Sequence, residues 1–241
     1  MNWKEIFKAH QLDFSELDKY QEKEGVKLHC DKEYFTVEEN WCREYKLGFN
    51  LLPIFTNAES DFVGVYTTGI LKGKVACVNH DDIDFAPRFR SLKSFIDKIN
   101  DTAISYDWHD LPLDKFDYPT QNELSQTERS EDNKILAECW DIITKKEFVS
   151  DSNYELIAQT ILNLTPFSEI EKVLCFLDDG NLFVQNKAIW LIGVYYQYLP
   201  AKEKIKEVLM KPKSKNEILW EKCYNGEFKK EKRGIWKRIF G

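Results

Sequence analysis

Between positions 49 and 78, short apolar runs are separated by polar segments, and this pattern predicts a small antiparallel sheet. Two apolar runs, 51–55 and 62–66, flank a polar segment at 57–61 that has the composition of a turn. A third run, 75–78, follows a segment that contains glycine. Because short strands joined by short turns tend to pair with their neighbours in the sequence, these runs are predicted to form a meander.

The period of the apolar residues changes after Pro87. Ser91 is suited to an N-cap, and the stripe that follows has the spacing i, i+3, i+4, i+7. The residues of this stripe are Leu92, Phe95, Ile96 and Ile99. An amphipathic helix is therefore predicted here, with its apolar face covering the sheet.

Before the sheet the pattern is mixed. Apolar side chains recur among charged ones from Trp3 to Gly25, which predicts one or two short helices that end at the glycine. Segments 27–30 and 34–37 are richer in strand formers. Segment 38–45 fits a helix or a strand equally well.

The second half of the chain has helical periodicity almost throughout. It follows a polar tract with few apolar residues, and short interruptions at 165–166, at 178–181 and at Pro200 divide it, so neighbouring helices are predicted to pack antiparallel as hairpins. The fold class is therefore α+β followed by an all-α region. The predicted organisation is an α+β domain at 1–119, a linker at 120–133, a helical domain at 134–225 and a basic tail at 226–241.

Charge is distributed unevenly over the 241 residues, which carry a formal net charge of −7. Residues 1–119 hold 15 basic and 22 acidic side chains, and residues 120–201 hold 6 and 13. Residues 202–241 reverse this balance, with 13 basic and 6 acidic side chains. The acidic body, residues 1–201, disfavours binding of nucleic acid and favours basic partners. The basic segment, residues 202–241, either binds a phosphate-rich surface or is simply exposed to solvent.

Composition places the chain among ordinary globular proteins, with 43% hydrophobic and 31% charged residues. No apolar stretch reaches the roughly 20 residues that span a bilayer, and no secretory leader is visible, so a cytosolic location is expected. The six cysteines lack metal-binding spacing and are expected to be reduced, mostly buried thiols.

The sequence contains no pattern that indicates catalysis. It lacks a G-x-S-x-G motif and a P-loop, and the spacing of the four histidines indicates no partner for any of them. The densest polar cluster is His80 with Asp81, Asp82 and Asp84, which fits a solvated turn better than a cation site because it lacks the EF-hand pattern. We therefore predict a protein that is not an enzyme, with no catalytic residue, metal or cofactor.

Five segments of the first half follow one another in a particular order. They are L-P-I-F at 52–55, V-G-V-Y at 63–66, G-K-V at 73–75, N-H-D at 79–81 and S-L-K-S-F-I at 91–96. In this order they resemble the central region of the SUKH superfamily, the bacterial relatives of a yeast cell-wall assembly regulator. The resemblance covers residues 49–100 and implies an antiparallel sheet with covering helices.

A second resemblance lies in the helical half. Segments 177–185 and 188–191 are similar to the turn and second helix of a HEAT repeat. This implies a short stack of helical hairpins, which buries its faces against neighbouring elements.

Bacterial SUKH proteins are typically immunity proteins that bind a polymorphic toxin domain and block it. The resemblance therefore implies a non-enzymatic protein that neutralises a toxin domain, such as a nuclease with a basic cleft, for which an acidic binder has the complementary charge. Exposed carboxylates beside aromatic anchors are the expected contacts. The candidate partner-binding residues are Asp61, Asp81, Asp82, Asp84, Trp41 and Tyr66.

Two alternatives remain open at this point. The helical half fits a regulatory or scaffold module that binds another protein, with the first domain as its platform. The basic tail fits a phosphate-surface binder, although neither nucleic acid nor membrane is the expected partner of the acidic body.

Overall fold

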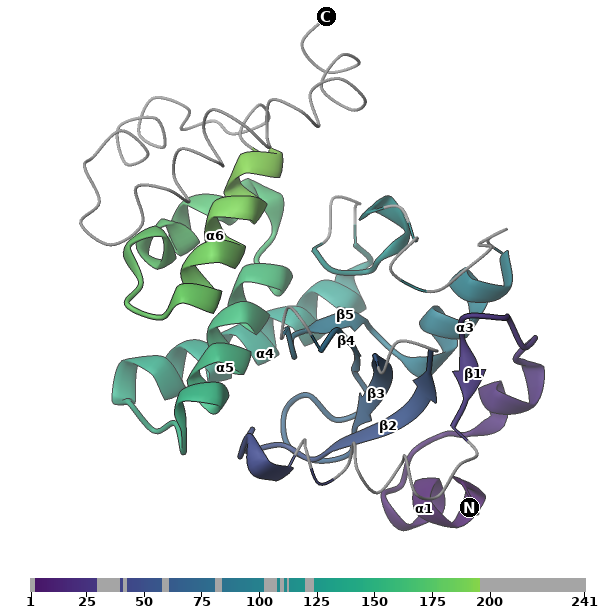
Figure 1. Cartoon of the computed structure of the whole chain (residues 1–241). Helices are drawn as coiled ribbons and strands as arrows, with labels where there is room; N and C mark the ends of the chain where they lie inside the picture. Colours follow the sequence, from purple (N-terminus) through teal and green to yellow (C-terminus); the bar gives the residue numbers. More distant parts are fainter. Residues whose placement is uncertain are drawn as a thin grey trace, which may run out of the picture. The chain divides into compact units, whose positions relative to one another are not determined.

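The computed structural model divides the chain into two compact units, Met1–Leu164 and Thr165–Gly241 (Figure 1). The residues it describes are 3–29, 40, 43–57, 61–80, 84–101, 108, 111, 113–119 and 124–195. The predicted strand at 34–37, the part of the predicted helical domain after residue 195 and the basic tail lie outside these residues.

The first unit is a mixed α+β structure around one antiparallel sheet. Its helical elements are α1 (Trp3–Ala9), α3 (Leu92–Asp101), α4 (Gln126–Lys145), α5 (Asp151–Leu164) and the 3-10 helices η1 (Ser15–Lys19) and η3 (Leu113–Lys115). Its strands are β1 (Lys27–Leu28), β2 (Leu51–Thr56), β3 (Phe62–Tyr66), β4 (Val75–Val78) and β5 (Pro87–Phe89). The strands pair in the order β1-β2-β3-β4-β5, so the sheet is a meander throughout. The three strands predicted at its centre are confirmed, and β5 was not predicted.

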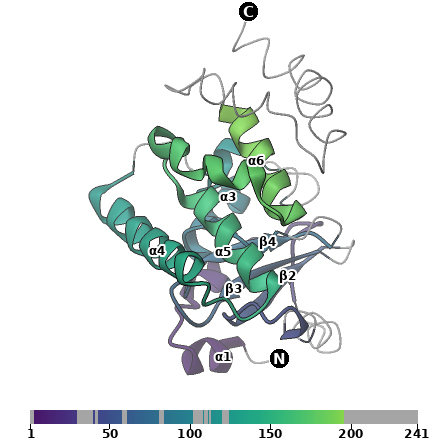
Figure 2. The same cartoon turned by 90° about the vertical axis from the view of Figure 1, so that its left-hand side faces the viewer.

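Both faces of the sheet are covered. Every residue of β3 and β4 is buried, and because successive side chains of a strand point to opposite faces, each face needs its own cover. Helix α3 packs on one face, where its four predicted stripe residues join Val63 and Val65 in a single core. Helix α5 contacts β5 and lies on the other side of the sheet from α3 (Figures 1 and 2).

Helix α4 begins inside the range predicted to be a linker, so that prediction is wrong for residues 126–133. Its first two turns contain no apolar side chain, which is why the sequence pattern concealed them. Ionic contacts hold them instead. Asp132 forms two 2.7 Å hydrogen bonds with Arg90, and the ammonium group of Lys74, whose side chain is 3% exposed, lies 2.8 Å from the half-exposed Glu131 carboxylate.

The start of α4 is fixed by a capping box. The Ser125 hydroxyl accepts a hydrogen bond from the Glu128 amide, and the Glu128 carboxylate accepts bonds from the Ser125 amide and hydroxyl. These bonds, the side-chain one first, lower the pKa of Glu128 below its ordinary value. The box therefore satisfies amides that the first turn of a helix cannot satisfy by itself.

Ser125→Ala is expected to destabilise the first unit by about 1 kcal/mol, the usual effect of losing an N-cap hydroxyl. It is also expected to raise the pKa of Glu128, because the hydrogen bonds that favour its ionised form are weakened. Since the folded pKa is depressed, the contribution of the box is present above the unfolded value of about 4.3 and is lost as the pH falls through the folded value. An NMR titration of Glu128 checks this, with Ser130→Ala on the exposed face of α4 as control; an unchanged Glu128 pKa would contradict it.

The described part of the second unit is a pair of helical elements, η4 (Phe167–Asp178) and α6 (Leu182–Tyr195), that pack against each other. The Gln185 amide donates a 2.8 Å hydrogen bond to the carbonyl of Leu177 across the turn between them. The first element is 3-10 rather than α-helical. Its buried side chains are those at 170, 173, 174, 176 and 177.

Candidate functional site

Asn57, Asp61 and His80 lie together where the three central strands β2, β3 and β4 begin or end. The hairpin register pairs Phe62 with Val78, so the residues that precede β3 and follow β4 lie side by side. The Asp61 carboxylate accepts hydrogen bonds from the His80 amide at 2.9 Å and from the Asn57 side-chain amide at 3.2 Å, and it lies 2.7 Å from His80 Nδ1. The Asn57 carbonyl oxygen in turn accepts a bond from the Asp61 backbone amide at 3.0 Å.

This cluster orients an imidazole. The contact between the Asp61 carboxylate and His80 Nδ1 holds the ring in one orientation, as in carboxylate–histidine pairs of metal and acid–base sites. The side chain of Asp61 is 2% exposed and that of His80 is 48% exposed. The buried carboxylate therefore orients a histidine ring that is half exposed at the surface. Within the described residues no group of three metal-ligating side chains accompanies it.

The sequence showed no partner for His80, because Asp61 is 19 residues away. The predicted meander nevertheless contained the information needed to find this partner. Once Phe62 is paired with Val78, the residues flanking those positions must be neighbours.

Two of the six predicted partner-binding residues are buried in this structure. Asp61 is 1% exposed and serves the cluster at the strand ends, and Tyr66 is 0% exposed with its hydroxyl donating a 2.6 Å bond to the carbonyl of Phe85. A turn carboxylate can be drawn inward where backbone and side-chain amides converge on it, and the local sequence does not reveal that convergence.

The remaining predicted residues divide into two groups. Asp84 is partly buried, accepts a bond from the Ala86 amide at 3.0 Å and forms a 3.2 Å ion pair with Arg88. Its carboxylate thus shapes the turn before β5, whatever else it contacts. Trp41, Asp81 and Asp82 lie outside the described residues.

A different exposed surface occurs on the helical unit. Leu182 and Phe183, at the start of α6, are 54% and 42% exposed. The Asn181 side chain accepts bonds from the amides of Phe183 and Val184, which fixes the first turn of the helix. Asp178 and Asp179 immediately precede this turn. We call the segment 178–183 the acidic–apolar turn.

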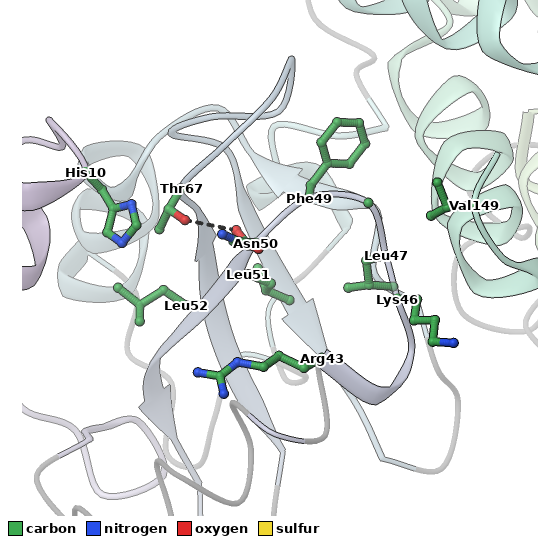
Figure 3. Close-up of a pocket in the computed structure, with 11 residues that line it drawn as sticks. His10, Arg43, Lys46, Leu47, Phe49, Asn50, Leu51, Leu52, Thr67 and Val149 are labelled. Carbon is green, nitrogen blue, oxygen red and sulfur yellow. Dashed lines mark hydrogen bonds between the residues drawn. The ribbon is translucent and has the colours of Figure 1, made fainter. Parts of the chain in front are cut away.

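The first unit also contains a pocket of about 430 Å³, a volume in the range of small-molecule sites. Four parts of the chain form it: the end of α1 at His10, the segment from Arg43 to Leu52, Thr67 after β3, and Val149 before α5 (Figure 3). This pocket could not be predicted from the sequence, because its walls are distant from one another along the chain.

The described cysteines have little nucleophilic character. Cys77 and Cys139 are buried, and burial raises the pKa of the Cys139 thiol to about 12. Cys175 is exposed, and desolvation raises its pKa as well. At neutral pH Cys139 and Cys175 are therefore thiols, and the thiolate is the reactive form.

Among the described helices, none has the length and apolar character that crossing a membrane requires. Comparison of the chain with known protein families, curated proteins and solved structures finds no match.

Proposed function

We propose that this chain is a non-enzymatic immunity protein that binds a basic toxin domain in the bacterial cytosol and neutralises it. The acidic–apolar turn is the observation that carries the proposal. Two adjacent apolar side chains held on a capped helix, next to two carboxylates, combine anchors for an apolar pocket with charge complementary to a basic rim. The predicted likeness of the sheet to SUKH proteins supports the same function.

The charge near the acidic–apolar turn agrees with this proposal. Between residues 165 and 195 the sequence holds four acidic and two basic side chains; Lys187 is buried and Asp178 is exposed. Residues 202–241 of the same unit hold 13 basic and 6 acidic side chains, so the excess of negative charge is local to this pair of helical elements. A basic partner that approaches the turn itself meets favourable charge.

The first experiment is capture from the native host with the full chain as bait, followed by expression of any captured toxin domain with and without this protein. Restored growth supports the proposal. Capture of housekeeping proteins alone, without rescue, favours the alternative of a regulatory scaffold that uses the same exposed turn.

Phe183→Ala is expected to weaken binding of the captured domain about 30-fold, as for a central aromatic contact worth about 2 kcal/mol. Asp178→Lys is expected to slow association and to reduce its dependence on salt. Titration calorimetry and stopped-flow mixing measure the two effects. Glu138→Lys, an exposed charge reversal on α4, is the matched control and should change neither; equal affinity of Phe183→Ala and the native chain would move the contact surface elsewhere.

A further inference from the structure

One end of the hairpin formed by β4 and β5 carries two neighbouring cations. Lys74 precedes β4 and Arg90 follows β5, and the pairing of Val75 with Phe89 places these flanking residues opposite each other. Lys74 is buried, and the side chain of Arg90 is 11% exposed. Charges withdrawn from water to this extent need partners of opposite charge.

The first half of α4 supplies these partners from one face. Glu128, Glu131 and Asp132 have the spacing i, i+3, i+4, which places their side chains side by side on a helix. Asp132 binds Arg90 through two 2.7 Å bonds, and a Glu128 oxygen lies 3.7 Å from Arg90 Nε. Glu131 lies 2.8 Å from the Lys74 ammonium. The acidic face of the helix thus neutralises the cation pair.

The two halves of α4 are attached to the first unit by different forces. Of residues 126–134 only Asp132 is buried, whereas Ile135, Leu136 and Cys139 of the second half are buried apolar side chains. Among the described residues, and leaving aside the cap at position 125, one more bond holds the side chains of 126–134 to the rest of the protein. It is the 2.7 Å bond that the Tyr118 hydroxyl donates to Asp132.

This difference allows the first half to open by itself. Releasing residues 126–134 exposes little apolar surface, so the core loses almost no hydrophobic stabilisation. Part of the lost ionic attraction is returned when the freed charges are hydrated. A polar segment of this length is too short to stay helical once it is detached. Segments with few buried apolar contacts commonly open at a lower free energy than the whole domain.

We propose that residues 126–134, which we call the ionic latch, open as a unit while the sheet, α3 and the second half of α4 remain folded. The closed form neutralises Lys74 and Arg90, and the open form presents them to solvent as an adjacent cation pair. The latch therefore switches the charge of this end of the sheet. It belongs to the first unit alone and does not rest on the proposed function.

Hydrogen exchange of the full chain, followed by NMR at several low urea concentrations, tests the latch. Amides 130–134 are expected to be at least about tenfold less protected than amides 97–100 of α3 and 139–143 of α4, because they exchange through the smaller opening. Their exchange should also depend little on urea, since that dependence scales with the surface exposed. Equal protection and equal urea dependence of the three segments would overturn the proposal.

Two variants separate the latch from the core. Ile96→Val trims a fully buried side chain of α3 and is expected to speed exchange of amides 97–100 roughly 2- to 12-fold. It should leave amides 130–134 unchanged, because the core is the same in the open and closed forms. Asp132→Asn is expected to speed exchange of amides 130–134 at least about tenfold, since it removes the charge that pairs with Arg90.

Lys134→Gln is the matched control for Asp132→Asn. It removes an exposed charge from the same segment, has no ion pair among the described residues and should leave exchange of the latch unchanged. Equal acceleration of both segments by Ile96→Val, or unchanged exchange of amides 130–134 in Asp132→Asn, would overturn the proposal.

Discussion

Asp132→Ala is expected to lower the free energy of unfolding of the first unit by about 3 to 5 kcal/mol, because it leaves a buried guanidinium without its partner. The Asp132 side chain is 2% exposed and that of Arg90 is 11% exposed, and two 2.7 Å bonds join them. The Tyr118 hydroxyl donates a third 2.7 Å bond to the same carboxylate, and the Arg90 guanidinium lies 4.6 Å from the centre of the Tyr118 ring. Urea unfolding followed by circular dichroism measures the loss.

The network has a defined protonation state. Burial, followed by the charge of Asp132, raises the pKa of Tyr118 above its ordinary value, so its hydroxyl remains a donor at physiological pH. Removing the carboxylate therefore deprives two donors of one acceptor. The cost arises from unsatisfied buried groups more than from lost attraction.

Two comparisons separate this explanation from a general effect of removing charge on α4. Asp141→Ala breaks an exposed ion pair with Lys145 on the same helix and should cost no more than about 0.5 kcal/mol. The triple replacement Arg90→Met, Tyr118→Phe and Asp132→Leu removes every polar member together and should recover most of the stability. A loss below about 1 kcal/mol for Asp132→Ala would contradict the explanation.

Phe95→Ala is expected to cost about 3 to 5 kcal/mol, the usual range for deleting a buried aromatic ring. Phe95 is 0% exposed at the centre of α3, with ring centroids 5.1 Å from Phe55 and 5.3 Å from Phe89. The cavity would therefore open between the helix and two strands, β2 and β5. The same urea unfolding measurement applies.

Phe183→Ala is the matched control, because its ring is 42% exposed and the change should alter stability by less than about 0.5 kcal/mol. Phe95→Leu keeps most of the apolar volume and should cost clearly less than alanine. Equal costs for alanine at positions 95 and 183 would mean that α3 does not carry the core.

Local patterns were sufficient for the centre of the first unit. The apolar runs at 51–55 and 62–66 form β2 and β3, and the stripe of α3 is buried as predicted. The predicted N-cap at Ser91 is confirmed by a 3.1 Å bond from the Ser94 amide to its hydroxyl. These features depend on residues within a few positions of one another, which the sequence displays directly.

Features that depend on distant partners were missed. The first turns of α4 are polar, and the bonds that hold them come from Arg90 and Lys74, 42 and 57 residues away. The burial of Asp61 likewise depends on His80 across a hairpin. The pocket of the first unit joins His10, Arg43 and Val149, so no window of the sequence contains it.

The short edge strands of the sheet have a consequence for association between copies of the chain. In the part that the structure describes, one edge is the two-residue β1, and the other is β5, which starts at Pro87 and therefore lacks an amide hydrogen there. The carbonyl of Pro87 accepts a 2.9 Å bond from the buried Asn163 side chain. An incoming strand would find few free backbone groups on either edge, so the native sheet is protected against growing by strand addition and against the aggregation that begins in this way.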